Sequence, residues 1–286
     1  MTILAAHRQH SRRFEDFKYV YPVLSRRSHG ISIGLNVNPD KACNFDCIYC
    51  QVDRTTESAV KKFDLAVAEE ELRDMLEMVR SGEIAQHEPF RSVPHEMLRL
   101  NDIALSGDAE PTTLPTFADT IQMIARVKPK DVKIVLITDA GGLDRSDVKR
   151  GLEIMDANNG EVWAKLDAGT EAYFKLINRT KIPFVRILKN VSETAKARPI
   201  VIQSLFLKIR EEGPSKEEIG EYCRRLREIG NVKLVQVYTI ARKAMTVVDG
   251  IPAWEFVSAL SNVEVDAITE RVRNEGGVKA ESFYGG

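Results

Sequence analysis

Residues 41–51 read Lys41-Ala42-Cys43-Asn44-Phe45-Asp46-Cys47-Ile48-Tyr49-Cys50-Gln51. The three cysteines have the spacing C-x3-C-x2-C, and the only other cysteine of the chain is Cys223. Thiolates this close together can all turn toward one soft metal centre. A structural zinc site takes four ligands and a cubane iron–sulfur cluster has four irons to ligate, so three cysteines leave one coordination position open. The stretch therefore predicts a reactive metal site rather than a structural one.

A zinc knuckle and a chance cluster are the alternatives for these cysteines. A zinc knuckle needs a fourth ligand nearby, and no histidine lies between residues 30 and 86. Cys223 falls on the apolar stripe of a helix expected near residues 216–229, which predicts a buried core thiol instead of a fourth ligand. The spacing therefore favours an iron–sulfur cluster held by Cys43, Cys47 and Cys50.

The composition is that of an ordinary globular protein. Of the 286 residues, 43% are hydrophobic and 29% are charged, and the net charge is −1, which gives no global attraction to nucleic acid. No apolar run reaches the ~20 residues needed to cross a bilayer, and the N-terminus lacks a signal-peptide layout. Four cysteines, three of them clustered, fit a reducing compartment. We therefore expect a cytoplasmic protein with no membrane contact.

Strand and helix patterns alternate along the chain. Strands are expected at residues 30–37, 102–106, 132–137, 161–167, 200–207 and 232–241. Helices are expected at residues 69–80, 117–124, 148–155, 171–178, 183–196, 216–229 and 265–275. Six strand–helix units predict an α/β fold with a mainly parallel sheet and right-handed crossovers, and they are too few to close an eight-stranded barrel.

One core domain is expected over residues 30–242, with an extension at each end. The extension at residues 243–286 is expected to pack on the core. The extension at residues 1–29 is basic and is interpreted either as a phosphate- or RNA-contacting arm or as a solvated segment. Its basic residues are Arg8, Arg12, Arg13, Lys18, Arg26 and Arg27.

The cysteine spacing, with Tyr49 just before the last cysteine, resembles the signature of the radical SAM superfamily. The resemblance implies a partial (β/α)6 TIM-like barrel, and Tyr49 is placed among the cofactor-binding residues. It also implies that the three thiolates hold a [4Fe–4S] cluster whose fourth iron binds S-adenosylmethionine (SAM). In this family one electron cleaves SAM, and the resulting 5′-deoxyadenosyl radical abstracts hydrogen from a substrate. A reducing partner such as flavodoxin or ferredoxin is implied as well.

The segment Ser-Gly-Asp-Ala-Glu-Pro-Thr at residues 106–112 resembles the loop that binds the SAM amino group in this family. The match assigns Gly107, Asp108, Ala109 and Glu110 to SAM binding. Ala109 stands where the family has a second glycine, and alanine adopts positive φ less readily. The alternative is a capped turn before the next helix.

Thr138-Asp139-Ala140-Gly141 resembles the T-N-G turn that lies close to SAM after the third strand of the family. Aspartate in place of asparagine keeps the acceptor and loses the amide donor. The resemblance assigns Thr138 and Asp139 to cofactor binding. An ordinary turn between strand and helix explains the segment equally well.

The segment Lys165-Leu166-Asp167-Ala168, followed by Asn178-Arg179, is similar to the branch of the superfamily that includes the wyosine-tRNA-forming synthases. Lys165 and Asp167 share one face of a strand because side chains alternate with period two. We expect the pair to face SAM or substrate in a catalytic role. A buried structural ion pair is the alternative.

Gln203, Gln236 and Arg242 are polar residues in or beside strands that otherwise read as buried. The two glutamines are expected to contact the adenine or ribose of SAM, and Arg242 a substrate carboxylate or phosphate. Packing and surface roles are the alternatives for all three.

Two classes of function fit these patterns. The first is a radical SAM enzyme acting on an RNA base, a peptide or a small metabolite, with tRNA as a possible partner. The second is a non-catalytic iron–sulfur or zinc protein that senses redox state or binds a partner. The second class has no need of a SAM loop, so residues 107–113 favour the enzyme.

Overall fold

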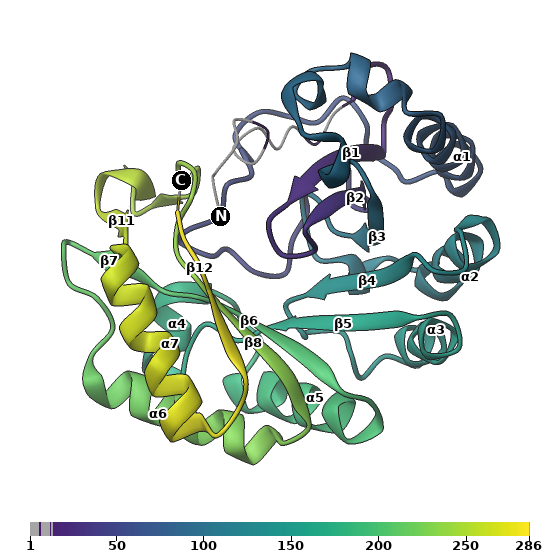
Figure 1. The fold of residues 1–286 in the computed structure, drawn as a ribbon. Helices are drawn as coiled ribbons and strands as arrows, with labels where there is room; N and C mark the ends of the chain where they lie inside the picture. The colour runs from purple at the N-terminus through teal and green to yellow at the C-terminus, as the bar shows by residue number, and fades with distance from the viewer. Residues whose placement is uncertain (1–5, 7–11, 13, 286) are drawn as a thin grey trace. The chain divides into compact units, whose positions relative to one another are not determined.

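The computed structural model describes residue 6, residue 12 and residues 14–285, so Arg8 and Arg13 of the predicted basic arm lie outside the described residues (Figure 1). The strands of the main sheet follow the order β1-β2-β3-β4-β5-β6-β8-β12. The chain divides into two compact units. The first comprises Met1–Ala42, Ser58–Ile137 and Arg145–Glu161, and the second comprises Cys43–Glu57, Thr138–Asp144 and Val162–Gly286.

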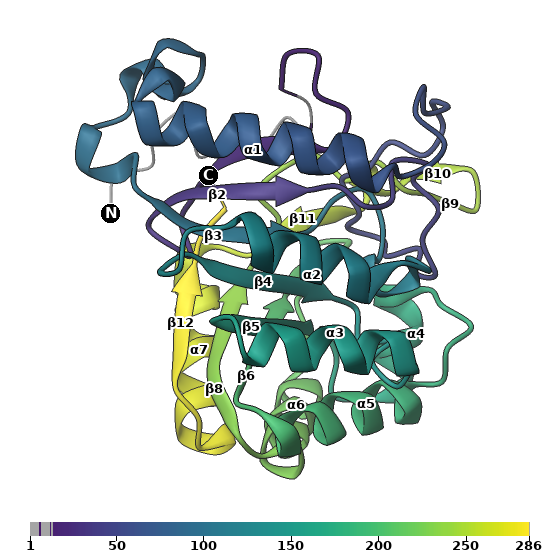
Figure 2. The same ribbon diagram turned by 90° about the vertical axis from the view of Figure 1, so that its right-hand side faces the viewer.

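The first unit contains one end of the main sheet and three helices. Its strands are β1 (Val20–Ser25), β2 (Gly30–Leu35), β3 (Leu100–Leu105) and β4 (Lys133–Thr138). β1 is antiparallel to β2, whereas β2, β3 and β4 are parallel. The helices lie side by side along one face of these strands (Figure 2). They are α1 (Leu65–Ser81), α2 (Phe117–Val127) and α3 (Ser146–Asp156).

Local sequence accounts for the ends of α1. The Asp64 side chain caps its first turn by accepting hydrogen bonds from the amides of Ala66 and Val67. Gly82, at φ 81°, ends the helix in the left-handed conformation that glycine adopts without a Cβ penalty. Leu72 and Met75 are fully buried. The helix therefore presents the apolar face that the sequence predicts, and it begins at Leu65 instead of residue 69.

β1 lies within residues 1–29, which the sequence presented as an extension. The buried carboxylate of Glu71 in α1 accepts hydrogen bonds from the amides of Lys18, Tyr19 and Val20, at 2.7–3.1 Å. Pro22 interrupts the strand pattern in the sequence, and proline is tolerated on an edge strand such as β1. The edge position explains why sequence periodicity missed this strand.

The second unit contains the other end of the main sheet. Its strands are β5 (Gly160–Lys165), β6 (Ile200–Leu205), β8 (Val232–Tyr238) and β12 (Ala280–Phe283). All neighbouring pairs among them are parallel. The helices are α4 (Glu171–Asn178), α5 (Phe184–Ala197), α6 (Lys216–Ile229) and α7 (Asn262–Gly276). Cys223 of α6 is fully buried, as predicted.

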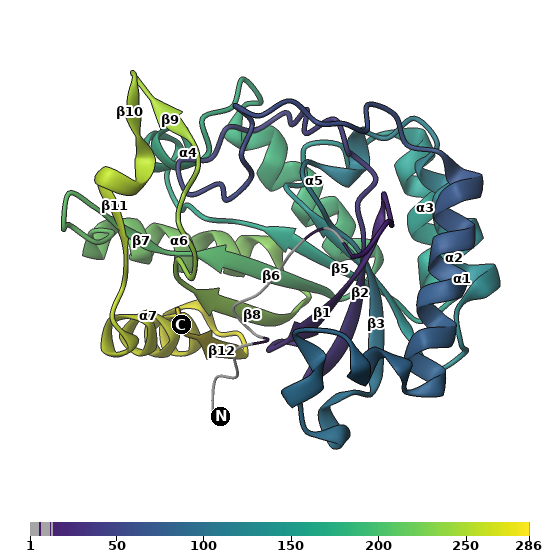
Figure 3. The same cartoon turned by 90° about the horizontal axis from the view of Figure 1, so that it is seen from above.

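Two small antiparallel sheets complete the second unit (Figure 3). β7 (Leu207–Ile209) pairs with β11 (Val257–Ala259), and β9 (Val247–Val248) pairs with β10 (Ile251–Pro252). Residues 243–286 thus contribute β9 to β12 and α7. None of the helices in the described part of the chain has the length and apolarity to span a membrane.

The six strands expected from the sequence are β2, β3, β4, β5, β6 and β8, and all seven expected helices are present. In the second unit the register places Lys165 beside Gln203, and Gln203 beside Gln236. Because paired residues of parallel strands point to the same side, these three form a polar row on one face. Ser204 points to the other face, where its hydroxyl bonds the Tyr222 hydroxyl of α6.

Candidate metal and cofactor site

The cysteine loop has no helix or strand of its own between Cys43 and Cys50 and is held by its neighbours in the second unit. The amide of Ile48 donates to the carbonyl of Ile177 in α4 at 2.9 Å, and the amide of Met245 donates to the carbonyl of Cys50 at 2.7 Å. Two more bonds join Asp46 N to Asn178 O at 3.2 Å and Thr246 Oγ1 to Cys47 O at 2.9 Å. Hydrogen bonds to α4 and to residues 245–246 therefore hold the loop in place.

The three thiols of the loop are half-buried, and none of them is in a disulfide. Arg54 Nη1 donates to Cys50 Sγ at 2.8 Å, and Asn178 Nδ2 donates to Cys47 Sγ at 3.5 Å. Burial lowers the pKa of Arg54, but its interactions with Cys50, Cys43 and Cys47 outweigh burial and raise it. All three sulfurs thus lie within electrostatic reach of one guanidinium.

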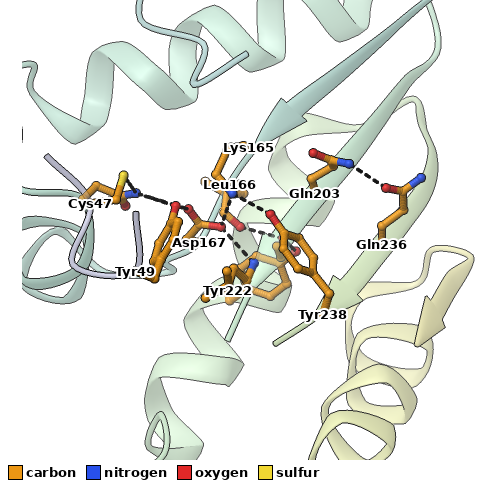
Figure 4. Close-up of polar contacts among 12 residues, drawn as sticks. Cys47, Tyr49, Lys165, Leu166, Asp167, Gln203, Tyr222, Gln236 and Tyr238 are labelled. Atoms are coloured by element: carbon orange, nitrogen blue, oxygen red, sulfur yellow. Dashed lines mark hydrogen bonds and ion pairs between the residues drawn. The ribbon is translucent and has the colours of Figure 1, made fainter. Parts of the chain in front are cut away.

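Asp167, directly after β5, collects hydrogen bonds from several elements (Figure 4). The Tyr49 hydroxyl and Asn178 Nδ2 donate to its Oδ2, the latter at 3.2 Å. The amide of Leu205 donates to its Oδ1 at 2.9 Å. Because Asn178 also contacts Cys47, this carboxylate is connected to the cysteine loop through side chains.

Lys165 completes this polar network. Its Nζ lies 3.3 Å from Asp167 Oδ1 and donates to the Tyr238 hydroxyl at 2.7 Å. The ammonium also lies 5.1 Å from the ring centroid of Tyr49 and 5.2 Å from that of Tyr238. The Lys165 side chain is 19% exposed and that of Asp167 is 1% exposed. The buried ion pair that the sequence offered as the alternative is present, and the catalytic role of the two residues stays a prediction.

The charges of this network shift its pKa values in consistent directions. Burial would lower the pKa of Lys165, but Asp167 and Tyr238 reverse the effect and raise it above its ordinary value. Burial and the Asp167 charge raise the pKa of Tyr49 well above its ordinary value. Burial and the Asp167 charge raise the pKa of Cys47, Asn178 opposes the rise, and the net value is about 12. Lys165 is therefore an ammonium at neutral pH.

Thr138 and Asp139 form a tight turn after β4. The Thr138 hydroxyl accepts from the amide of Ala140 at 3.0 Å, and Asp139 Oδ1 accepts from the amide of Gly141 at 2.7 Å. Ala140 adopts φ 68°, a left-handed conformation that is costly for any residue but glycine. Asn44 Nδ2 lies 3.5 Å from Asp139 Oδ1, so the turn contacts the cysteine loop beside Cys43.

Gly107 to Glu110 form a loop of the first unit. Asp108 pairs with Arg12 at 2.8 Å and accepts from Asn36 Nδ2 at 2.7 Å. A Cβ at Gly107 would lie 2.3 Å from Asn36 Oδ1, so this close approach requires glycine.

The rest of this loop forms a capped turn. Glu110 accepts from the amide of Thr112 at 3.0 Å and from its hydroxyl at 2.6 Å. Ala109 is not among the described residues with positive φ, so it needs no glycine-like conformation. The turn that the sequence offered as an alternative is therefore present, and the role of residues 107–110 in SAM binding stays a prediction.

Gln203 and Gln236 satisfy each other. Gln203 Nε2 donates to Gln236 Oε1 at 2.8 Å, and both side chains are buried. Gln203 lies beside Lys165 on the neighbouring strand, and Gln236 lies beside Gln203 on the next (Figure 4). Their predicted contact with adenine or ribose stays a prediction, as does the substrate role of Arg242.

The chain is similar to parts of two longer proteins. No protein-family model matches the chain. It is 28% identical over 163 residues to the UPF0026 protein MJ1312 of Methanocaldococcus jannaschii, covering 55% of this chain and 43% of that protein. It is 24% identical over 269 residues to the GTPase Obg of Brachyspira hyodysenteriae, covering 90% of this chain and 36% of that protein. The chain thus spans less than half the length of either relative.

Solved structures share the arrangement of helices and strands. TYW1 with a lysine–pyruvate adduct has a TM-score of 0.54 at 16% identity, over 86% of this chain and 74% of that chain. Streptococcus suis SuiB bound to S-adenosylmethionine has a TM-score of 0.57 at 13% identity, over 90% and 52%. Spore photoproduct lyase with bound AdoMet has a TM-score of 0.56 at 9% identity, over 93% and 79%. The chain shares the fold of these proteins. The predicted partial (β/α)6 barrel is confirmed.

The thiols of the cysteine loop suit a thiolate-ligated cluster by their chemistry. Cys43, Cys47 and Cys50 are soft donors on one fastened loop, and none is in a disulfide. In the described part of the chain, no three His, Cys, Asp or Glu side chains converge as a ready metal cage. Cys43 Sγ, for example, donates to Asn44 Oδ1 at 3.7 Å. Three thiol donors on one loop fit iron–sulfur ligation.

Sequence reasoning missed two residues that the fold brings to the cysteines. Arg54 lies four positions after Cys50 in a charged segment, and nothing in the sequence marks it as a partner for sulfur. Asn178 was noted only as part of a motif, but it touches both Cys47 and Asp167. Its position at the end of a predicted helix was the sequence signal that could have identified Asn178.

Proposed function

We propose that this chain is a radical SAM enzyme. Cys43, Cys47 and Cys50 hold a [4Fe–4S] cluster, and the enzyme cleaves SAM reductively and abstracts hydrogen from a substrate that is an RNA base, a peptide or a small metabolite. The proposal rests on one observation: within this fold, three thiols outside any disulfide lie on one loop that its neighbours hold in place, and Arg54 donates to one of the sulfurs. The bound cluster and SAM would supply one electron and a 5′-deoxyadenosyl radical.

The residues around the cluster would hold its ligands, and the bound SAM or substrate, in position. Asn178 holds the Cys47 thiol and Asp167 together, and Tyr49 places its ring and hydroxyl between the loop and the carboxylate. Lys165 places a fixed positive charge in the polar row that it forms with Gln203 and Gln236. An anionic group of SAM or substrate would bind there.

The similar structure of TYW1 contains a lysine–pyruvate adduct. Imine formation is therefore one role to consider for Lys165. An imine forms from a neutral amine, whereas Lys165 is held as an ammonium by Asp167 and the Tyr238 hydroxyl. We therefore assign Lys165 an electrostatic role. A reducing partner such as flavodoxin or ferredoxin, a cytoplasmic location and tRNA as a substrate class belong to the same proposal.

The test is anaerobic reconstitution with iron and sulfide, followed by SAM and dithionite. We expect about four irons and four sulfides per chain and formation of 5′-deoxyadenosine, which disappears in Cys47→Ala. Cys223→Ala is the matched control, because Cys223 is buried in α6, and it should keep both properties.

Two results would contradict the proposal. Zinc in place of iron would favour a structural metal protein, and a fully loaded, reduced chain that yields no 5′-deoxyadenosine would favour a redox sensor. If the enzyme is active, the substrate class follows from adding bulk tRNA, peptides or metabolites separately and measuring which one increases 5′-deoxyadenosine.

A further inference from the structure

Arg54 contacts the cysteine loop by its side chain. Its Nη1 lies 2.8 Å from Cys50 Sγ, and it interacts electrostatically with Cys43 and Cys47 as well. The side chain is half-buried, so water screens its charge only in part. Arg54 therefore places one positive charge, and one hydrogen-bond donor, beside the sulfurs.

Two other cations near the thiols, Arg179 and Lys165, form their close pairs with oxygen atoms. Arg179, which directly follows α4, pairs with the carboxylate of Asp46, at 3.1 Å. Lys165 pairs with Asp167 and Tyr238. Of these three cations, Arg54 is the one that donates a hydrogen bond to sulfur.

We propose that Arg54 is a positioning residue that raises the reduction potential of the cluster bound by Cys43, Cys47 and Cys50. Reduction adds one electron from an external one-electron donor and makes the cluster with its three thiolates one unit more negative. A fixed guanidinium stabilises the more negative state more than the other, and its hydrogen bond to sulfur acts in the same direction. Arg54 thereby makes the cluster easier to reduce. This inference rests on the proposed function only in requiring that the three cysteines hold a cluster.

The experiment is a redox titration of the reconstituted protein, followed by electron paramagnetic resonance of the reduced cluster, without SAM. The variants are Arg54→Gln, which removes the charge, Arg54→Lys, which keeps it, and Arg179→Gln, which removes a charge that does not contact sulfur. We expect R54Q to bind the same iron and sulfide per chain and to have a lower midpoint potential. R54K and R179Q should stay close to the wild-type value.

Each other outcome has a defined meaning. A fully loaded R54Q with the wild-type potential overturns the proposal, and so does a fall of equal size in R179Q. If R54Q loads no cluster, R54K decides: loading at the wild-type potential supports a role for the charge, and failure to load overturns it. A potential shift in a protein that never cleaves SAM would support Arg54 while rejecting the enzyme. A wild-type chain that loads no iron would reject both.

Discussion

Asp167 is the residue on which the polar contacts of the second unit converge. It is nearly fully buried and accepts hydrogen bonds from Tyr49, Asn178 and the Leu205 amide as well as from Lys165. A buried carboxylate is stable only when donors of this kind replace water. The carboxylate has several partners, whereas Lys165 depends on fewer and is partly exposed.

This asymmetry predicts unequal effects of substitution. Asp167→Ala leaves a lysine and several donors without their acceptor and should lower the free energy of unfolding by about 3–5 kcal/mol. Lys165→Met leaves Asp167 with its remaining donors and should cost about 1–2 kcal/mol. Urea unfolding of both variants measures the difference. Equal losses would show that the carboxylate depends on the ammonium more than its hydrogen bonds indicate.

At the scale of elements, caps and tethers determine where segments begin. The buried Glu71 binds the amides that lead into β1, and Asp64 caps α1. At the start of α7, Ser261 and Glu264 form a reciprocal capping box, and Glu264 also pairs with Lys208 of β7 at 3.0 Å. These contacts join α7 to the strand that precedes α6.

The capping box predicts a pH dependence of stability. Hydrogen bonds from Ser261 and Lys208 lower the pKa of Glu264 to about 2, from the model-compound value of 4.5. A carboxyl whose pKa is lower in the folded state adds stability above pH 4.5 that is lost as the pH falls toward 2. Glu264→Gln should therefore be less stable than wild type at pH 6, and the gap should narrow in acid.

Urea unfolding between pH 6 and pH 3 measures this gap. Glu270→Gln, on the exposed side of the same helix and outside the capping box, is the control and should show a smaller dependence on pH. A gap that stays constant with pH would mean that Glu264 acts through its hydrogen bonds alone, without its charge.

At the scale of the whole molecule, the cysteines fall into two environments. Cys43, Cys47 and Cys50 are half-buried on a loop, whereas Cys223 is fully buried between α6 and the carbonyl of Arg271 in α7. Access to Cys223 requires unfolding of the surrounding core, whereas a loop thiol is reached from the folded state.

This difference predicts the order of alkylation in the metal-free protein. Iodoacetamide should modify Cys43 and Cys50 quickly, whereas Cys223 should react only when denaturant unfolds the chain. Peptide mass spectrometry after timed quenching measures each site. Equal rates at Cys223 and Cys43 under native conditions would show that α6 and α7 open readily.

Much of this molecule was predictable from local sequence. The alternation of β-branched runs and amphipathic segments determined six strands and seven helices, because burial of one face requires that periodicity whatever the neighbours are. The spacing of Cys43, Cys47 and Cys50 likewise indicated soft-metal chemistry, since ligand type and proximity are local properties. The expectation that Lys165 and Asp167 share one face came from the two-residue period of a strand.

Only the tertiary structure decided which side chains meet across the sequence. Arg54 reaches Cys50, Asn178 reaches Cys47, and Asp108 is paired with Arg12. β1 and β12 were also invisible in the sequence, because short edge strands with proline or few apolar residues are stabilised by their neighbours. The physical reason is the same in each case: these contacts join residues far apart along the chain or in irregular segments, where no local periodicity records them.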